Sequence, residues 1–120
     1  MTLAEYNTFC GSLAHTTTVI QWGGAYVWKV AGKVFAIAWD APDYLQVTFK
    51  VSPIAFEILK DEAGTRPAPY MASRGMKWIQ DFEPPGLGDA ELKAHIKTSY
   101  KLVSMKLTQK LQKELGLNQD

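Results

Sequence analysis

The segment YLQVTFKV, residues 44–51, alternates apolar and polar side chains and predicts a β-strand with one buried face. Its apolar side chains would enter the core: Leu45, Val47, Phe49 and Val51. The side chains between them would face outward: Tyr44, Gln46, Thr48 and Lys50. The β-branched segment HTTTVIQ, residues 15–21, is soon followed by Gly23 and Gly24 and predicts another short strand and a turn.

The segment AYVWKVAGKVFAIAWD predicts a β-hairpin that turns at its Ala-Gly pair. A two-residue loop would pair Trp28 with Phe35 and Tyr26 with Ile37. This register places the large aromatic side chains on one face of the sheet. The residues expected on the other face are Val27, Lys29, Val34 and Ala36.

Three other segments show helical spacing. Thr2 and Glu5 have the spacing of a capping box and predict where a first helix begins. Ser52 and Pro53 predict the start of a second helix, because serine is a good N-cap and proline suits the first turn. Asp89 is expected to cap a long third helix. The apolar stripe that would dock this helix on the sheet consists of Leu92, Ile96, Tyr100, Val103 and Leu107.

Between the second and third helices, TRPAPYMASRGMKWIQDF predicts two more strands around a turn at residues 73–75, and Thr108 would cap a last short helix. The order helix, three strands, helix, two strands, helix predicts an α+β fold. We expect a two-layer sandwich in which helices cover one face of an antiparallel sheet of about five strands. The length fits a single domain spanning residues 1–120. The expected core residues are Trp28, Phe35, Ile37, Val47, Phe49, Trp78, Leu92, Ile96 and Val103.

Composition limits the classes of function. The 13 basic and 12 acidic residues leave a formal net charge of +1, so attraction to a polyanion would have to come from local clustering. No apolar run approaches the ~18 residues of a membrane span. The N-terminal segment has an acid and no basic region, unlike a signal peptide. These features predict a cytoplasmic protein without a membrane partner.

The lysines of the third helix are the first candidate binding residues. No acid occurs from Leu92 to Lys113, although a helix that is merely soluble usually mixes charges of both signs. Lys93, Lys97 and Lys101 follow one another at intervals of four and lie beside the apolar stripe. They are either the solvated flank of a docked helix or a surface that faces phosphate groups, and spacing alone does not distinguish the two.

Cations near the hairpin turns are the second set of candidates. Lys29 and Lys33 flank the first hairpin turn, and Arg74 and Lys77 flank the second. Each pair is either an ordinary polar turn or a tip that grips phosphate.

Residues with catalytic or metal-binding chemistry are sparse. The single cysteine, Cys10, falls in the first helix and is expected to be a buried small side chain. His15 and His95 lack a cysteine, histidine or carboxylate at ligand spacing. We therefore predict no catalytic residues, no metal site, no cofactor and no enzymatic activity. Asp40 and Asp43 flank a proline and are expected to form a turn.

Several motifs occur together in a characteristic order: GKVFA at residues 32–36, PAPYM followed by KW at residues 67–78, and SYKLV at residues 99–103. As a set they resemble the MmcQ/YjbR family of small bacterial proteins over nearly the whole chain. The resemblance implies an α+β fold similar to CyaY-like and secretion-chaperone-like folds. It also implies DNA binding through a "double-wing" arrangement of hairpins. The chain departs from the family after the first helix, where Leu13-Ala14-His15 replaces the usual Leu-Pro-Gly type of turn.

Two functions remain as hypotheses. The first is weak, largely phosphate-driven binding of double-stranded DNA by a monomer. Its candidate contact residues are Lys29, Lys33, Arg74, Lys77, Lys93, Lys97 and Lys101. The alternative is a module that binds a protein or peptide partner through an exposed face of the sheet, without catalysis.

Overall fold

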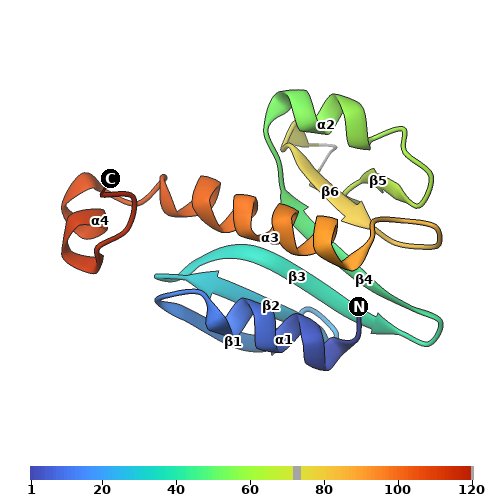
Figure 1. Ribbon diagram of the computed structural model, residues 1–120, viewed down its shortest axis with the longest axis horizontal. Helices are drawn as coiled ribbons and strands as arrows, with labels where there is room; N and C mark the ends of the chain where they lie inside the picture. The colour runs from blue at the N-terminus through green and yellow to red at the C-terminus, as the bar shows by residue number, and fades with distance from the viewer. Residues whose placement is uncertain (72–73, 120) are drawn as a thin grey trace.

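The computed structural model describes residues 1–71 and 74–119 and confirms the α+β class (Figure 1). Its helices are α1 (Leu3–Ser12), α2 (Pro53–Leu59), α3 (Asp89–Ser104) and α4 (Gln109–Leu115). Its strands are β1 (Thr16–Gln21), β2 (Ala25–Val30), β3 (Lys33–Ala41), β4 (Tyr44–Lys50), β5 (Thr65–Pro67) and β6 (Trp78–Asp81). They form one antiparallel sheet of six strands in the order β1-β2-β3-β4-β6-β5. The expected number of about five was too low, because β1 pairs with β2 along its whole length.

Helices α1 and α3 lie over the same face of the sheet, and α2 lies beside β5 and β6 (Figure 1). The principal core lies between this face of the sheet and the helices. The apolar stripe of α3 is buried in this core. Phe49 and Ile96 are fully buried there, and the ring of Phe35 meets the ring of Tyr100 edge to face at 5.4 Å. The short helix α4 lies beyond the C-terminal end of α3.

A β-bulge between Trp28 and Lys29 makes the expected hairpin register wrong. Trp28 pairs with Ala36 and not with Phe35, and Tyr26 pairs with Ala38 and not with Ile37. The extra residue in β3 lets Phe35 and Ala36 both join the core under the helices. In β3 beyond the bulge, the residues that face the helices are therefore shifted by one position from those expected.

Two residues expected in the helix-facing core lie on the opposite face of the sheet. Ile37 forms a second apolar cluster with Ala25 and Val27, against which Met71 packs. Trp78 pairs with Lys50, whereas Ile79 pairs with Phe49 and joins the principal core. The remaining residues of the expected core do lie in the principal cluster: Trp28, Phe35, Val47, Phe49, Leu92, Ile96 and Val103.

The face opposite α1 and α3 offers less open surface than the protein-binding hypothesis assumed. Thr48, expected to face solvent, is 2% exposed, and Val27 is fully buried. Ala36, expected on this face, packs under the helices together with Ala38 and adds no apolar surface here. This face is partly covered by the segment that contains Met71.

Local sequence signals placed most helix starts correctly. Thr2 and Glu5 form the capping box, and the side chains of Ser52 and Thr108 cap α2 and α4. Asp89 is not the cap of α3: it is the first helical residue, and Gly88 precedes it without a side-chain cap. In the turn predicted at residues 73–75, Ser73 lies outside the described residues.

Candidate nucleic-acid interface

The strand register gathers lysines at one end of the sheet. Lys33 begins β3 opposite Val30, Lys50 ends β4 opposite Trp78, and the carbonyl of Lys77 accepts a hydrogen bond from the N–H of Val51. The C-terminal end of α3 reaches the same end of the sheet, because Ser99 hydrogen-bonds to the backbones of Phe35 and Lys50. We call this region the basic end, and it comprises Lys29, Lys33, Lys50, Lys77, Lys101 and Lys106.

Lys50 and Lys106 are two cations of the basic end whose charges interact. Burial lowers the pKa of the half-buried Lys50, and the positive charge of Lys106 lowers it further. Within residues 1–71 and 74–119, the salt bridges are those of the Met1 ammonium with Asp89 and of Lys60 with Glu57. In that part of the chain, neither Lys50 nor Lys106 forms a salt bridge with a carboxylate, so nothing of that kind offsets the repulsion between their charges. A bound anion would relieve this repulsion.

The seven cations singled out from the sequence do not share one face. Lys29 alternates with Trp28 and Val30, which pack under the helices, so it lies on the opposite face of the sheet. Lys97 and Lys101 are exposed on α3, in the helical layer. Lys29, Lys33, Lys77 and Lys101 nevertheless reach the basic end from these different layers.

The local environments differ among three other candidate cations, Lys77, Lys93 and Arg74. The ammonium of Lys77 lies 4.6 Å from the centroid of the Phe56 ring, and the side chain remains exposed. Lys93 lies near the other end of α3, and its ammonium is 6.0 Å from the centroid of the Phe9 ring. The Met1 ammonium lowers the pKa of Asp89 there, and the charge of Lys93 lowers it further. Arg74 is exposed in the segment before β6.

The sequence reasoning missed Lys50 and Lys106 as candidate site residues. Lys50 was expected only to face outward at the end of its strand. Lys106 lies two residues beyond Ser104, the last residue of α3. The signal that pointed to them was weak, because only the packing of α3 against β4 brings these two positions together.

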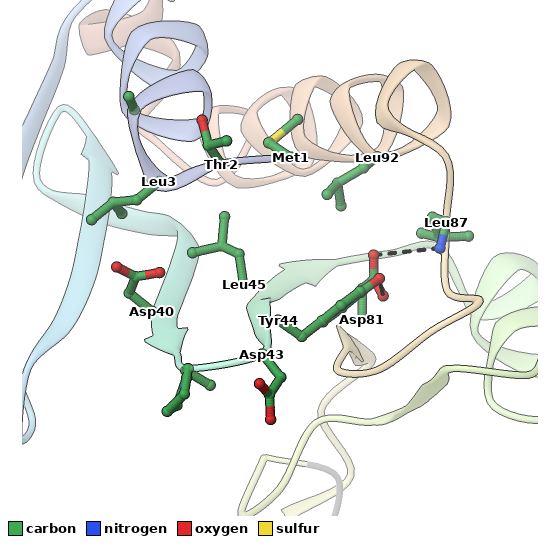
Figure 2. A pocket seen from close by; sticks show the side chains of 13 residues that line it. Met1, Thr2, Leu3, Asp40, Asp43, Tyr44, Leu45, Asp81, Leu87 and Leu92 are labelled. Atoms are coloured by element: carbon green, nitrogen blue, oxygen red, sulfur yellow. Dashed lines mark hydrogen bonds between the residues drawn. The ribbon is translucent and has the colours of Figure 1, made fainter.

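Acidic residues collect at the opposite end of the sheet, around a pocket of about 510 Å³ (Figure 2). Asp40 and Asp43 lie at the β3–β4 hairpin, while Asp81 lies with Tyr44 (Figure 2). The Tyr44 hydroxyl donates to the Asp81 carboxylate at 2.7 Å, and the N–H of Leu87 donates to the same group at 3.4 Å. Burial raises the pKa of Asp81. Carboxylates therefore gather at one end of the sheet and lysines at the other.

The reactive side chains noted in the sequence are each engaged in other contacts or buried. Cys10 is fully buried, and burial raises the pKa of its thiol to about 12, so the thiol stays protonated near neutral pH. His95 stacks on Phe49, and His15 Nε2 lies 2.8 Å from the carbonyl oxygen of Leu115. In the part of the chain that the structure describes, no three His, Cys, Asp or Glu side chains are arranged to hold a metal ion.

The comparisons with known proteins agree with this architecture. The model of the YjbR family matches residues 11–102. The chain belongs to the YjbR family. Among curated proteins, none matches this YjbR chain. None of the helices within the described residues has the length and apolar character needed to cross a membrane.

Two solved structures share the fold of this YjbR protein. A Deinococcus radiodurans protein, DR2400, with a DUF419 domain superposes with a TM-score of 0.85 at 23% identity, covering 97% of this chain and 88% of its own. A protein from Pseudomonas syringae superposes with a TM-score of 0.69 at 21% identity, covering 86% of this chain and 99% of its own. At these identities the likeness concerns the fold.

Proposed function

We propose that this YjbR protein binds double-stranded DNA through the phosphate groups, using the basic end. The observation that supports the proposal is the gathering of lysines at one end of the sheet, which follows from the strand register and from the hydrogen bonds of Ser99 to the backbones of Phe35 and Lys50. Burial and the charge of Lys106 lower the pKa of Lys50, and a bound anion would favour the charged form of this side chain. The DNA-binding role implied by the family resemblance is compatible with this arrangement.

Binding of this kind comes mostly from the release of counterions from DNA. With a net charge of only +1, the affinity should be modest and should fall steeply with salt. If three or four phosphates are engaged, log K should fall with log[salt] at a slope of about −3 to −4. Sequence preference should be slight, because phosphate contacts carry no base information.

The proposal assigns no catalytic step to the chain. The buried, protonated thiol of Cys10 is a poor nucleophile, and the partly buried ring of His95 stacks on Phe49. The proposed function is binding alone, without a cofactor.

The test is a titration of a fluorescent duplex at several salt concentrations by anisotropy. Changing both Lys50 and Lys106 to Gln should weaken binding at low salt and reduce the magnitude of the slope by about 2. A charge-matched control changes Lys60 and Lys93 to Gln. Lys60 forms a salt bridge with Glu57, and Lys93 lies near Asp89. The control should change the slope by less than about 0.5.

Three results would reject the proposal in different ways. No binding of wild type at low salt removes DNA as a partner. Equal losses in the two double variants show that only net charge matters and that the basic end is not a site. Full affinity in the Lys50 and Lys106 variant places the binding surface elsewhere.

A further inference from the structure

The strand β1 forms an open edge of the sheet that is unusually suited to pairing. The sheet ends at β1 on one side and at β5 on the other. Edge strands are commonly protected by shortness, proline or charge. The strand β5 has all three, because it spans Thr65–Pro67, ends in proline and contains Arg66. The strand β1 spans Thr16–Gln21 without a charge or a proline, and its pairing with β2 shows no irregularity.

The side chains of β1 lie largely in solvent. All four central residues, from Thr17 to Ile20, are exposed. Val19 is 40% exposed, Ile20 is 61% exposed, and Trp22 at the adjoining turn is 58% exposed. Exposed apolar residues next to an unprotected edge are a known risk of association unless a partner covers them.

The backbone of β1 also has a defined set of groups that point away from β2. The N–H of Ala31 donates to the carbonyl of His15 at 3.0 Å, which identifies His15 as a residue that faces β2. Because inward and outward pairs alternate in an antiparallel ladder, Thr16, Thr18 and Ile20 direct their N–H and C=O groups outward. These groups are spaced to bond another extended strand.

We propose that β1 pairs antiparallel with β1 of a second copy of this chain, with Thr18 opposite the partner's Thr18. In this register Thr16 and Ile20 face the partner's Ile20 and Thr16, so all three outward residues exchange both backbone hydrogen bonds. On the other face of the sheet, Thr17 and Val19 face the partner's Val19 and Thr17. Threonine–threonine and threonine–aliphatic pairs are favourable cross-strand neighbours.

Charge favours a second copy as the occupant. The strand β1 contains no charged residue that would repel β1 of a second copy, and the net charge of +1 leaves little repulsion between whole chains. The Thr16 end of β1 lies beside the basic end, and the Gln21 end lies toward the acidic residues at the β3–β4 hairpin. Antiparallel pairing therefore sets the basic end of each copy beside the acidic end of its partner.

The pairing would join the two sheets into one, with α1 and α3 of both copies on the same face. The contact is small, so the dimer should be weak, with a Kd of about 10–100 µM. This proposal departs from the monomer expected from the sequence. It does not rest on DNA binding, because the backbone hydrogen bonds between the two copies are made by β1 alone.

Sedimentation equilibrium from about 1 µM to about 1 mM chain tests the association. Wild type should pass from the mass of one chain to the mass of two. Ile20→Lys places a charge on the edge and should weaken association at least about tenfold. The matched control is Ile54→Lys on α2, at an isoleucine that is 77% exposed and far from β1 along the sheet order, and it should associate like wild type.

Amide hydrogen exchange of wild type gives a second readout that needs no variant. The amides of Thr18 and Ile20 should become protected by about tenfold as the concentration rises through the Kd, while those of Thr17 and Val19 are protected throughout by β2. A single-chain mass at 1 mM overturns the proposal, as does an equal loss of association in both lysine variants. Dimerisation without added protection at Thr18 and Ile20 also overturns it.

Discussion

The side-chain hydroxyl of Ser99 accepts a hydrogen bond from the backbone N–H of Lys50 at 2.8 Å. The same hydroxyl donates to the carbonyl oxygen of Phe35 at 2.7 Å, and Ser99 is fully buried. One side chain of α3 therefore satisfies groups on both β3 and β4 where the bulge and the strand end leave them without ladder partners. This contact also fixes the backbone of Lys50 at the basic end.

Changing Ser99 to Ala should lower the free energy of unfolding by about 1–3 kcal/mol, because a buried donor and a buried acceptor lose their partner. Chemical denaturation monitored by tryptophan fluorescence measures the change. Thr98→Ala, at the exposed neighbouring position, should cost less than about 0.5 kcal/mol. Equal costs at the two positions would mean that water replaces the Ser99 hydroxyl.

Changing Phe49 to Ala should lower the free energy of unfolding by about 3–5 kcal/mol, because Phe49 is fully buried under α3 and stacks on His95. Ile54→Ala on α2 is the comparison, since Ile54 is 77% exposed, and it should cost less than about 1 kcal/mol. A cost below about 1 kcal/mol at Phe49 would contradict the register of β4.

The sequence was most informative where the physical cause is local. The capping box of Thr2 and Glu5 and the caps of Ser52 and Thr108 depend on neighbouring residues only, and all were predicted. The alternation in β4 likewise placed Val47 and Phe49 in the core. Thr48 was misassigned because alternation shows which residues share a face but not whether a distant segment covers the other face.

Long-range packing explains the other differences. The bulge beside Trp28 lets Phe35 and Ala36 both enter the core, and a two-residue hairpin loop carries no signal for it. The coupling of Lys50 with Lys106 arises only when α3 lies across β4. Contact with DNA stays a prediction for every lysine named, because similar folds carry different functions.

Changing Gly64 to Ala should destabilise the fold strongly. A methyl group there would lie 2.3 Å from the carbonyl oxygen of Glu83 and 2.3 Å from the backbone nitrogen of Gly86, and backbone atoms cannot move aside like a side chain. Gly64 also has a φ of +90°, which alanine adopts only with strain. We expect a loss of more than about 3 kcal/mol in the free energy of unfolding.

The control for Gly64 is Gly23, which has a φ of +77° but no atom within 4 Å of the position of an added methyl group. Gly23→Ala therefore carries the backbone strain alone and should cost about 1–2 kcal/mol. Thermal unfolding of both variants separates the two effects. Similar losses of stability in the two variants would show that the backbone around Glu83 and Gly86 moves to accommodate the methyl group.

The stability of the protein should fall as the pH drops through the range in which His95 titrates. Burial of the ring against Phe49 lowers the pKa of His95, and the negative charge of Glu91 opposes this shift only in part. Below the unfolded pKa of about 6.5, His95 is protonated in the unfolded chain but stays neutral in the folded protein until the pH reaches its lower folded pKa. The folded state therefore loses stability as pH falls from about 6.5 to the lower folded pKa, at no more than about 1.4 kcal/mol per pH unit.

Two variants test this linkage between pH 8 and pH 5.5, where most carboxylates stay ionised. His95→Phe keeps an aromatic ring against Phe49 and should lose this part of the pH dependence. Glu91→Gln removes the opposing charge and should extend the sensitive range to lower pH. Proton NMR of the His95 ring gives the folded pKa directly. A folded pKa above 6.5 would reverse the sign, because protonation would then stabilise the folded state and the ring could not be held in a desolvated stack.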